Sequence, residues 1–407
     1  MSDAASAAEA AARASYGRLV AYLAAQWRDI ARAEDALGDA LVAALETWPR
    51  TGVPARPEAW LLTAARRRLI DDARRSTVAS AAESDLAMML EERGDGARGA
   101  FPDERLALMF VCANPAIEAS ARTPLMLQAV LGLGAAPIAS AFLVAPATMS
   151  QRLVRVKTKI RDAGITFALP EPHELPGRLE AVLEAIYAAY GTGWDDVAGG
   201  DPQRRGLAEE AIWLGRVAVD LLPGEPETRG LLALMLHCEA RRGARRDGGR
   251  YVPLSAQDPR MWSPEMIDEA ERLLGDAARA RRPGRFQLEA AIQSAHAHRA
   301  VTGRTEWEEI VLLYRALLDV APTIGARVGH TAAVAEARGA EAALTELETL
   351  DGDAVAQYQP YWALRAHLMQ RLGRAPEASD AYQRAIGLCE DAAAREFLVA
   401  RLRDEAR

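Results

Sequence analysis

Residues 147–161 read ATMSQRLVRVKTKIR, and the interpretation of the whole chain starts from this stretch. Its apolar residues recur at three- and four-residue spacing, which is the period of one helix face. These residues are Met149, Leu153, Val156 and Ile160. The other positions are mostly polar or cationic and include the only two lysines of the chain, Lys157 and Lys159. We therefore predict an amphipathic helix with its apolar face turned inward and its basic face turned outward.

The residues before this helix extend the prediction to a helix-turn-helix. A short helix is expected around residues 135–142, a turn at 143–146, and the longer helix over 147–163, with Gly164 as its stop. Short polar groups near the start of the second helix would approach base edges in the major groove, and the cations further along suit phosphates. The predicted DNA-facing residues are Thr148, Ser150, Gln151, Arg152, Arg155, Lys157, Lys159 and Arg161. The alternative is an ordinary helix with a solvated basic face.

The same helical spacing continues through nearly the whole chain, which predicts an all-α fold. Residues 13–76 form a first predicted helical domain. Residues 77–102 are rich in Ala, Ser, Glu, Asp and Gly and are interpreted as a linker. Residues 103–168 contain the helix-turn-helix. Beyond a proline-rich hinge, residues 177–407 alternate helices with Pro or Gly turns, and residues 362–386 resemble a tetratricopeptide repeat.

Composition limits the classes of protein to consider. The 407 residues carry a formal net charge of -8, which excludes a protein that is basic overall but leaves room for a local basic face. Cys112, Cys238 and Cys389 lie far apart in the sequence, which predicts reduced cysteines and no metal site.

The first residues lack the pattern of a secretory signal, and no apolar run approaches the ~20 residues of a membrane span, so we expect a cytoplasmic protein without membrane contact. No Walker-type loop, nucleophile elbow or HExxH motif is present, so we expect no cofactor, no catalytic residues and no enzymatic activity.

The first predicted domain carries two helices of opposite charge. The helix over residues 29–48 is acidic through Glu34, Asp35, Asp39 and Glu46. The helix that starts at Pro57 is rich in arginine, and its arginines are Arg66, Arg67, Arg68, Arg74 and Arg75. This arrangement suits two partners, a basic protein surface for the first helix and a nucleic-acid backbone for the second. Taken alone, each charge run also fits a solvated surface.

Longer stretches make a family resemblance specific. Residues 33–49, AEDALGDALVAALETWP, followed by residues 57–71, PEAWLLTAARRRLID, resemble region 2 of extracytoplasmic-function (ECF) RNA polymerase sigma factors. Residues 103–110, DERLALMF, together with the segment 131–161, resemble region 4 of the same family. Residues 247–262, DGGRYVPLSAQDPRMW, resemble a signature of the ECF subgroup with a C-terminal tetratricopeptide-like extension. The order of region 2, region 4 and extension covers nearly the whole chain.

The resemblance implies a role for each segment. Region 2 would bind the β′ clamp of RNA polymerase core through Glu34, Asp35 and Asp39. Its loop 49–56 and the following helix would capture an unstacked base of the −10 promoter element and hold the melted strand. The residues implied in this second role are Arg56, Trp60, Arg66, Arg67, Arg68, Arg74 and Arg75. Region 4, residues 103–168, would read the −35 element and contact the β flap of the polymerase.

Some positions depart from the family pattern. Gly38 stands where the family usually has glutamine, which weakens the expected polymerase contact. Gly134 and Pro137 replace the Ser or Thr and the Glu of a capping box at the first helix of the helix-turn-helix. Pro259 stands where the signature usually has arginine, and region 2 is shortened at its front.

The signature segment holds four residues with two open interpretations: Asp247, Gln257, Asp258 and Trp262. In the first interpretation they bind a regulatory protein or ligand that controls the sigma module. In the second, which we favour, the Asp and Gln side chains cap neighbouring helices and Trp262 fills the core.

Two functional hypotheses follow from the sequence. The first is a promoter-specificity subunit without chemistry of its own, whose partners are RNA polymerase core and promoter DNA. The second is a helical-repeat scaffold for protein interaction whose DNA-binding domains are degenerate, and Gly38 and the missing capping box support it. Association with core polymerase separates the two hypotheses.

Overall fold

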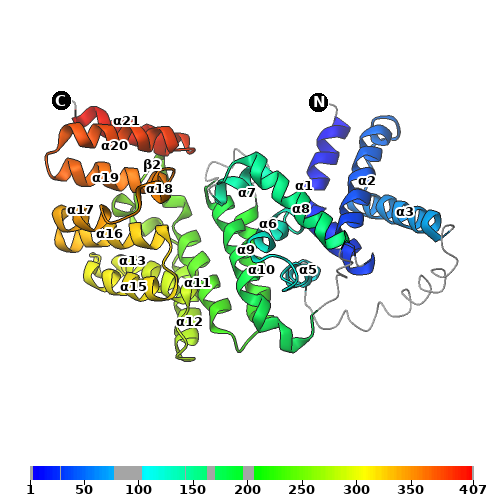
Figure 1. The fold of residues 1–407 in the computed structure, drawn as a ribbon, viewed down its shortest axis with the longest axis horizontal. Helices are drawn as coiled ribbons and strands as arrows, with labels where there is room; N and C mark the ends of the chain where they lie inside the picture. Colours follow the sequence, from blue (N-terminus) through cyan, green and yellow to red (C-terminus); the bar gives the residue numbers. More distant parts are fainter. Residues whose placement is uncertain are drawn as a thin grey trace. The chain divides into compact units, whose positions relative to one another are not determined.

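The computed structural model describes residues 3–27, 29–77, 103–142, 144–162, 170–195 and 206–405. Within these ranges the regular secondary structure is helical, apart from one antiparallel hairpin of β1 (Arg246–Asp247) and β2 (Arg250–Tyr251). The predicted all-α class is therefore confirmed. The chain divides into two compact units, whose helices are labelled in Figure 1. The first unit comprises Met1–Thr192 and Asp201–Leu221, and the second comprises Gly193–Gly200 and Leu222–Arg407.

The first unit begins with three helices that pack on one another: α1 (Asp3–Trp27), α2 (Ile30–Thr51) and α3 (Pro57–Thr77). Asp29 caps α2, because its carboxylate accepts a hydrogen bond from the backbone N–H of Arg32 at 3.0 Å. The buried residues of α2 recur at helical spacing from Ile30 to Trp48. Helix α2 therefore forms where a cap and an apolar face coincide.

Proline and glycine set the junction between α2 and α3. Helix α2 was predicted over residues 29–48, and it continues through Pro49 to Thr51, three residues further. The helix ends at Gly52, which has a φ of 85°, a conformation that favours glycine. Pro57 lies in the first turn of α3, as predicted.

Among the described residues, α3 is followed by α5 (Glu104–Cys112), α6 (Ala119–Ala129), α7 (Ala135–Ala141) and α8 (Pro146–Asp162). Asp103 caps α5 by accepting hydrogen bonds from the backbone N–H groups of Arg105 and Leu106. Helix α7 starts at Gly134 without a side-chain cap, as the sequence predicted. Helices α7 and α8 pack against each other across a short turn. The expected stop of α8, Gly164, lies outside the described residues.

Two helices from the predicted 177–407 segment also belong to the first unit. They are α9 (Leu175–Asp195), which follows the short 3-10 helix η1 (Pro172–Glu174), and α10 (Leu207–Leu221). The buried Arg178 of α9 donates a hydrogen bond to the backbone carbonyl of Phe110 in α5 and pairs with Glu174. Arg105 of α5 pairs with Glu210 of α10. Helices α9 and α10 are thus fastened to α5 by buried and half-buried arginines.

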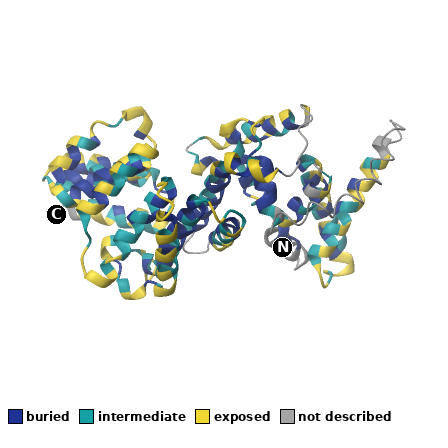
Figure 2. Cartoon of the chain, turned by 90° about the horizontal axis from the view of Figure 1, so that it is seen from below, coloured by how far each residue is buried: buried dark blue, intermediate teal, exposed yellow. Residues whose placement is uncertain are grey.

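The second unit is a sequence of packed helices with the hairpin near its start. Its elements are α11 (Pro226–Ala240), η2 (Arg242–Arg245), β1, β2, η3 (Leu254–Ala256), η4 (Pro259–Met261), α12 (Pro264–Ala278), α13 (Arg285–Ala297), α14 (Arg299–Thr302), α15 (Trp307–Val320), α16 (Ile324–Arg338), α17 (Ala340–Leu347), α18 (Gly352–Val355), α19 (Gln359–Arg371), α20 (Ala375–Leu388) and α21 (Ala392–Glu405). Most helices pack on those nearest in sequence, and the apolar residues between them are buried (Figure 2). Strand β2 also packs on α21, where the rings of Tyr251 and Phe397 meet with their centroids 5.4 Å apart.

The stretch predicted to resemble a tetratricopeptide repeat folds as the helix pair α19 and α20. The turn between them contains Gly373 at a φ of 69°, and Tyr382 is buried on the packing face and donates a hydrogen bond to Gln370. The resemblance to tetratricopeptide repeats itself stays a prediction.

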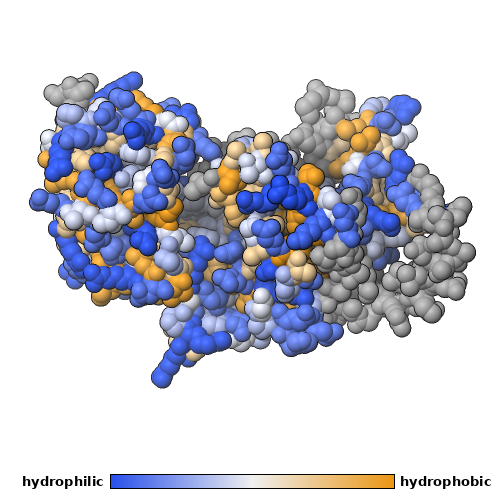
Figure 3. All heavy atoms as spheres, in the orientation of Figure 1, coloured by the Kyte–Doolittle hydropathy of each residue, from blue (hydrophilic) through white to orange (hydrophobic). Residues whose placement is uncertain are grey.

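Hydrophilic side chains cover much of the face in Figure 3, and hydrophobic ones form smaller patches between them. None of the described helices combines the length and hydropathy that a membrane span requires. Within the described residues, no three His, Cys, Asp or Glu side chains come together as a metal site, and the three cysteines are free.

Candidate nucleic-acid interface

Helix α8 is anchored by the aliphatic stripe that the sequence predicted. The buried residues of its inner face are Met149, Leu153, Val156 and Ile160. They fix the rotation of the helix about its axis, because four apolar side chains at helical spacing must all face the packed helices α6 and α7. The outward direction of every other α8 side chain follows from this anchor.

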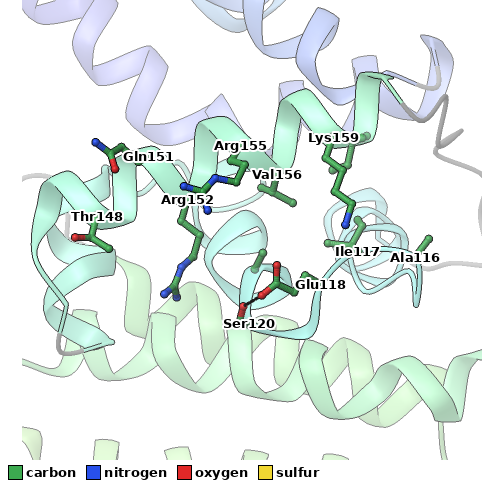
Figure 4. A pocket seen from close by; sticks show the side chains of 12 residues that line it. Ala116, Ile117, Glu118, Ser120, Thr148, Gln151, Arg152, Arg155, Val156 and Lys159 are labelled. Atoms are coloured by element: carbon green, nitrogen blue, oxygen red, sulfur yellow. Dashed lines mark hydrogen bonds between the residues drawn. The ribbon is translucent and has the colours of Figure 1, made fainter.

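A groove with a volume of about 250 Å³ runs along one outer face of α8 (Figure 4). From α8 it is lined by Thr148, Gln151, Arg152, Arg155, Val156 and Lys159. The opposite wall is the start of α6 and the loop before it, where Ser120 donates a hydrogen bond to Glu118 at 2.7 Å. In Figure 4, Arg152 and Lys159 extend toward this wall.

Three cationic side chains of α8 lie in a row along the groove. Arg152, Arg155 and Lys159 are spaced by three and four residues, so they share one face of α8. Within the part of the chain that the structure describes, none of the three has an ion-pair partner. Their charges are therefore available to an anion.

Lys157 does not belong to this row of cations. Its Nζ lies 2.6 Å from Oε2 of Glu34 on α2, and the two side chains are only 23% and 11% exposed. Burial raises the pKa of Glu34, and Lys157 opposes that shift. The structure thus divides the predicted DNA-facing set: Thr148, Gln151, Arg152, Arg155 and Lys159 line the groove, Lys157 pairs with α2, and Ser150 is exposed outside the groove. The Arg161 side chain lies outside the described residues.

The acidic residues of helix α2 also fall into two groups, one paired with α8 and one exposed to solvent. Glu34 points to Lys157, whereas Asp35 and Asp39 are exposed on the opposite, outer face. Val42, which is 56% exposed, continues that face, and Leu45, which is 49% exposed, lies beside it toward the Glu34 side. The sequence did not single out Val42, although its spacing from Asp35 and Asp39 places these three residues on one face of a helix. Leu45 was expected on the apolar face of this helix, and the structure instead leaves it half exposed. Exposed apolar residues beside acidic ones indicate a protein-binding surface.

The predicted arginine cluster of α3 has members in different situations. Arg67 and Arg68 are exposed, and Arg68 lies 3.6 Å from Asp39 of α2. Arg66 is instead part of the fold, because it packs over the Tyr22 ring of α1 at 4.9 Å and donates hydrogen bonds to Tyr22 and Gln26. Arg74 is exposed, and the Arg75 side chain lies outside the described residues.

The start of α3 holds the other two residues predicted for strand capture. Trp60 is half-buried and meets the buried Trp48 edge-on, with ring centroids 5.5 Å apart. Arg56 is exposed in the loop before α3. An aromatic ring next to an exposed cation is a suitable platform for a stacked base.

The four residues predicted in the signature segment lie in the second unit. Gln257 is buried and donates a hydrogen bond to the carbonyl of Val252, Asp258 caps η4 through the backbone N–H of Arg260, and Trp262 is buried. The Arg260 guanidinium lowers the pKa of Asp258 to about 2. Asp258 and Trp262 thus make the contacts of the second interpretation, whereas Gln257 binds a loop carbonyl and caps no helix.

Asp247 differs from the other three residues. It is exposed on the hairpin, 3.7 Å from Arg250. A regulatory role for the segment stays a prediction.

Comparison with known proteins places the front of the chain in a family. Residues 13–78, which correspond to α1–α3, match the sigma-70 region 2 domain. Residues 178–278, which include most of α9 and all of α10–α12, match a family of unknown function (DUF6596). An uncharacterized protein of Rhizobium meliloti is 40% identical over 381 residues, which cover 91% of this chain and 89% of the relative. No solved structure matches the chain. The chain belongs to one family with the uncharacterized R. meliloti protein, and the sigma-70 region 2 domain at its front indicates a factor of the sigma-70 family.

Proposed function

We propose that this chain is an alternative sigma factor of the ECF type, which binds RNA polymerase core and directs it to promoters with a −10 and a −35 element. One observation supports the proposal beyond the family match. Helix α8 carries Arg152, Arg155 and Lys159 in line on a solvent-facing groove, without ion-pair partners among the described residues. Such cations bind DNA phosphates favourably because each contact releases condensed counterions.

Helix α8 would act as the recognition helix for the −35 element. Thr148 and Gln151 lie near its N-terminus, where short polar side chains can reach base edges. Arg152, Arg155 and Lys159 would contact phosphates and position the helix without reading sequence. In this proposal the domain around α8 also contacts the β flap of the polymerase.

Helix α2 would dock on the β′ clamp of the polymerase. Its exposed surface combines two apolar residues, Val42 and the adjoining Leu45, with the carboxylates of Asp35 and Asp39. Apolar residues at the centre of an interface supply affinity, and charges at its rim supply orientation and fast association. The face therefore suits a partner surface that is apolar at its centre and basic around it.

Helix α3 and the loop before it would hold the melted −10 strand. Extruding one base from the duplex costs a few kcal/mol, and stacking together with phosphate contacts offsets this cost. Trp60 offers the stacking ring, and Arg56, Arg67 and Arg68 offer exposed charges.

In vitro transcription with purified core polymerase tests the proposal. We expect promoter-dependent transcript with the wild-type chain and core, and strongly reduced transcript with the double variant Arg152→Ala/Arg155→Ala. The matched control is Arg272→Ala/Arg279→Ala, which removes the same charge from exposed positions on α12 and at its C-cap. Absence of transcript from any promoter with folded wild-type protein would count against the proposal.

The competing scaffold function keeps one supporting observation, the uncapped start of α7 at Gly134. A scaffold with degenerate DNA-binding domains would not associate with core polymerase. Co-purification with core through an α2 face that is sensitive to Asp35→Ala and Leu45→Ala would exclude it.

A further inference from the structure

Helix α1 crosses the end of α6 at very short range. A Cβ atom on Gly17 of α1 would lie 1.7 Å from the backbone oxygen of Val130. Only glycine fits at this crossing, because the nearest atom is backbone and cannot rotate away. On the other side of the contact, the Tyr16 ring packs on Gly132, where a Cβ would lie 3.2 Å from the ring. The sequence thus has a glycine on each of the two segments that meet, and helix α1 also packs on α5.

A second contact joins the same two groups of helices. Glu34 of α2 and Lys157 of α8 form the half-buried ion pair described above, with 2.6 Å between charged atoms. Partial burial makes such a pair more selective than a surface salt bridge, because the loss of either partner leaves the other charge poorly solvated. The group α1–α3 is therefore held to the group α5–α8 by a glycine crossing and by one specific charge pair.

This closed arrangement conflicts with simultaneous reading of two promoter elements. At 3.4 Å per base pair, positions −10 and −35 lie about 85 Å apart along the DNA axis. Helices α2, α3 and α8 have 17 to 22 residues and are only about 25 to 33 Å long. Surfaces on helices of this length that touch one another cannot lie about 85 Å apart. Covalent geometry allows the 25 residues 78–102 to span at most about 90 Å, so the chain itself permits separation.

We propose that Glu34 and Lys157 form a latch that holds the −10-reading helices against the −35-reading helices, and that this latch must open before the chain engages a promoter. The inference rests on the proposed sigma function. It assigns Glu34 to the latch rather than to the polymerase contact. It also assigns Lys157 to the control of α8 rather than to the row of cations in the groove.

Distance measurement in the full-length chain tests the latch. Spin labels attached through unnatural amino acids at the exposed positions Thr51 on α2 and Val154 on α8 report the separation of the two groups and leave the native cysteines in place. We expect one short distance for the wild type. Glu34→Gln and Lys157→Gln should each raise the ratio of open to closed molecules about tenfold.

Three further variants make the result specific. The charge swap Glu34→Lys/Lys157→Glu should restore the short distance. Lys159→Gln is the matched control, because it removes a lysine from the same helix without touching α2, and it should leave the distance unchanged. Gly17→Ala should open the latch by steric conflict while improving the helix propensity of α1. Circular dichroism checks that every variant is folded.

The outcomes separate the latch from the proposed function. Equal distance distributions for Glu34→Gln, Lys157→Gln and Lys159→Gln would overturn the latch. A short distance in the transcribing complex of wild-type chain, core and promoter would overturn it as well. Longer distances in the two latch variants, without transcript from the folded wild-type chain, would support the latch and refute the sigma function.

Discussion

Replacement of Arg152 and Arg155 by alanine should change the salt dependence of promoter binding in a calculable way. Both guanidinium groups line the groove on α8 and lack ion-pair partners within the described residues, so each is free to neutralise one phosphate. Each neutralised phosphate contributes about 0.9 to the slope of log K against log salt. The double variant should therefore lose about 1.8 units of slope.

The same slope fixes the size of the defect at each salt concentration. Relative to 1 M salt, 1.8 units correspond to a loss of about 60-fold in affinity at 0.1 M and only about 3- to 4-fold at 0.5 M. The defect at 0.1 M equals about 2.4 kcal/mol. The assay is fluorescence anisotropy of a labelled promoter fragment with the chain and core polymerase, titrated at several salt concentrations.

The control and the refuting result are defined by the structure. Arg272→Ala/Arg279→Ala removes two exposed arginines, one on α12 and one at its C-cap, and should leave the slope unchanged. If the Arg152→Ala/Arg155→Ala plot runs parallel to the wild-type plot, the two arginines do not contact phosphates and the groove is not the DNA-binding face.

Three other predictions follow from the fold. Burial, assisted by Arg241, lowers the pKa of His237 and His296 to about 4, so the unfolded state binds protons first as the pH falls. The free energy of unfolding should therefore decrease between pH 7 and pH 4, by up to about 3 kcal/mol per histidine, and less so in His237→Gln/His296→Gln, as measured by urea denaturation. Asp29→Ala should destabilise the first unit by about 1 kcal/mol through loss of the α2 cap, whereas Asp29→Asn should not, as measured by thermal unfolding. A chain that ends at residue 169 should be less stable to proteolysis than one that ends at residue 221, because only the longer one keeps α9 and α10.

Local features of the fold were predictable from the sequence because they depend on neighbouring residues. The stripe from Met149 to Ile160 depends only on helical period, and the Asp29 cap depends on a residue three positions away. The break predicted from Pro49, Gly52 and Pro54 falls at Gly52, because α2 runs through Pro49 to Thr51 and glycine accepts the positive φ that ends it.

The candidate site was predictable only in part, since its remaining features depend on distant contacts. Lys157 and Lys159 look equivalent in the sequence, and only the position of Glu34, 123 residues away, distinguishes them. Arg66 likewise looks like a member of the arginine cluster until Tyr22 and Gln26 are placed beside it. Such pairings depend on the packing of helices and leave no periodic signal in the chain.

Residues 178–278, which match the family of unknown function, are divided between the two units: α9 and α10 belong to the first, and α11 and α12 belong to the second. The matched segment begins at Arg178, whose buried guanidinium needs the carbonyl of Phe110 and the carboxylate of Glu174 to satisfy its charge and its donors. Phe110 is itself fully buried in α5, the first helix of the group that ends with α8. A change that strains α9 would therefore be transmitted to the core beneath the candidate DNA-binding helix. Because the first helices of the extension complete this core, its loss would impair DNA binding through folding alone, and a regulatory role of the extension can be judged only in variants that retain α9 and α10.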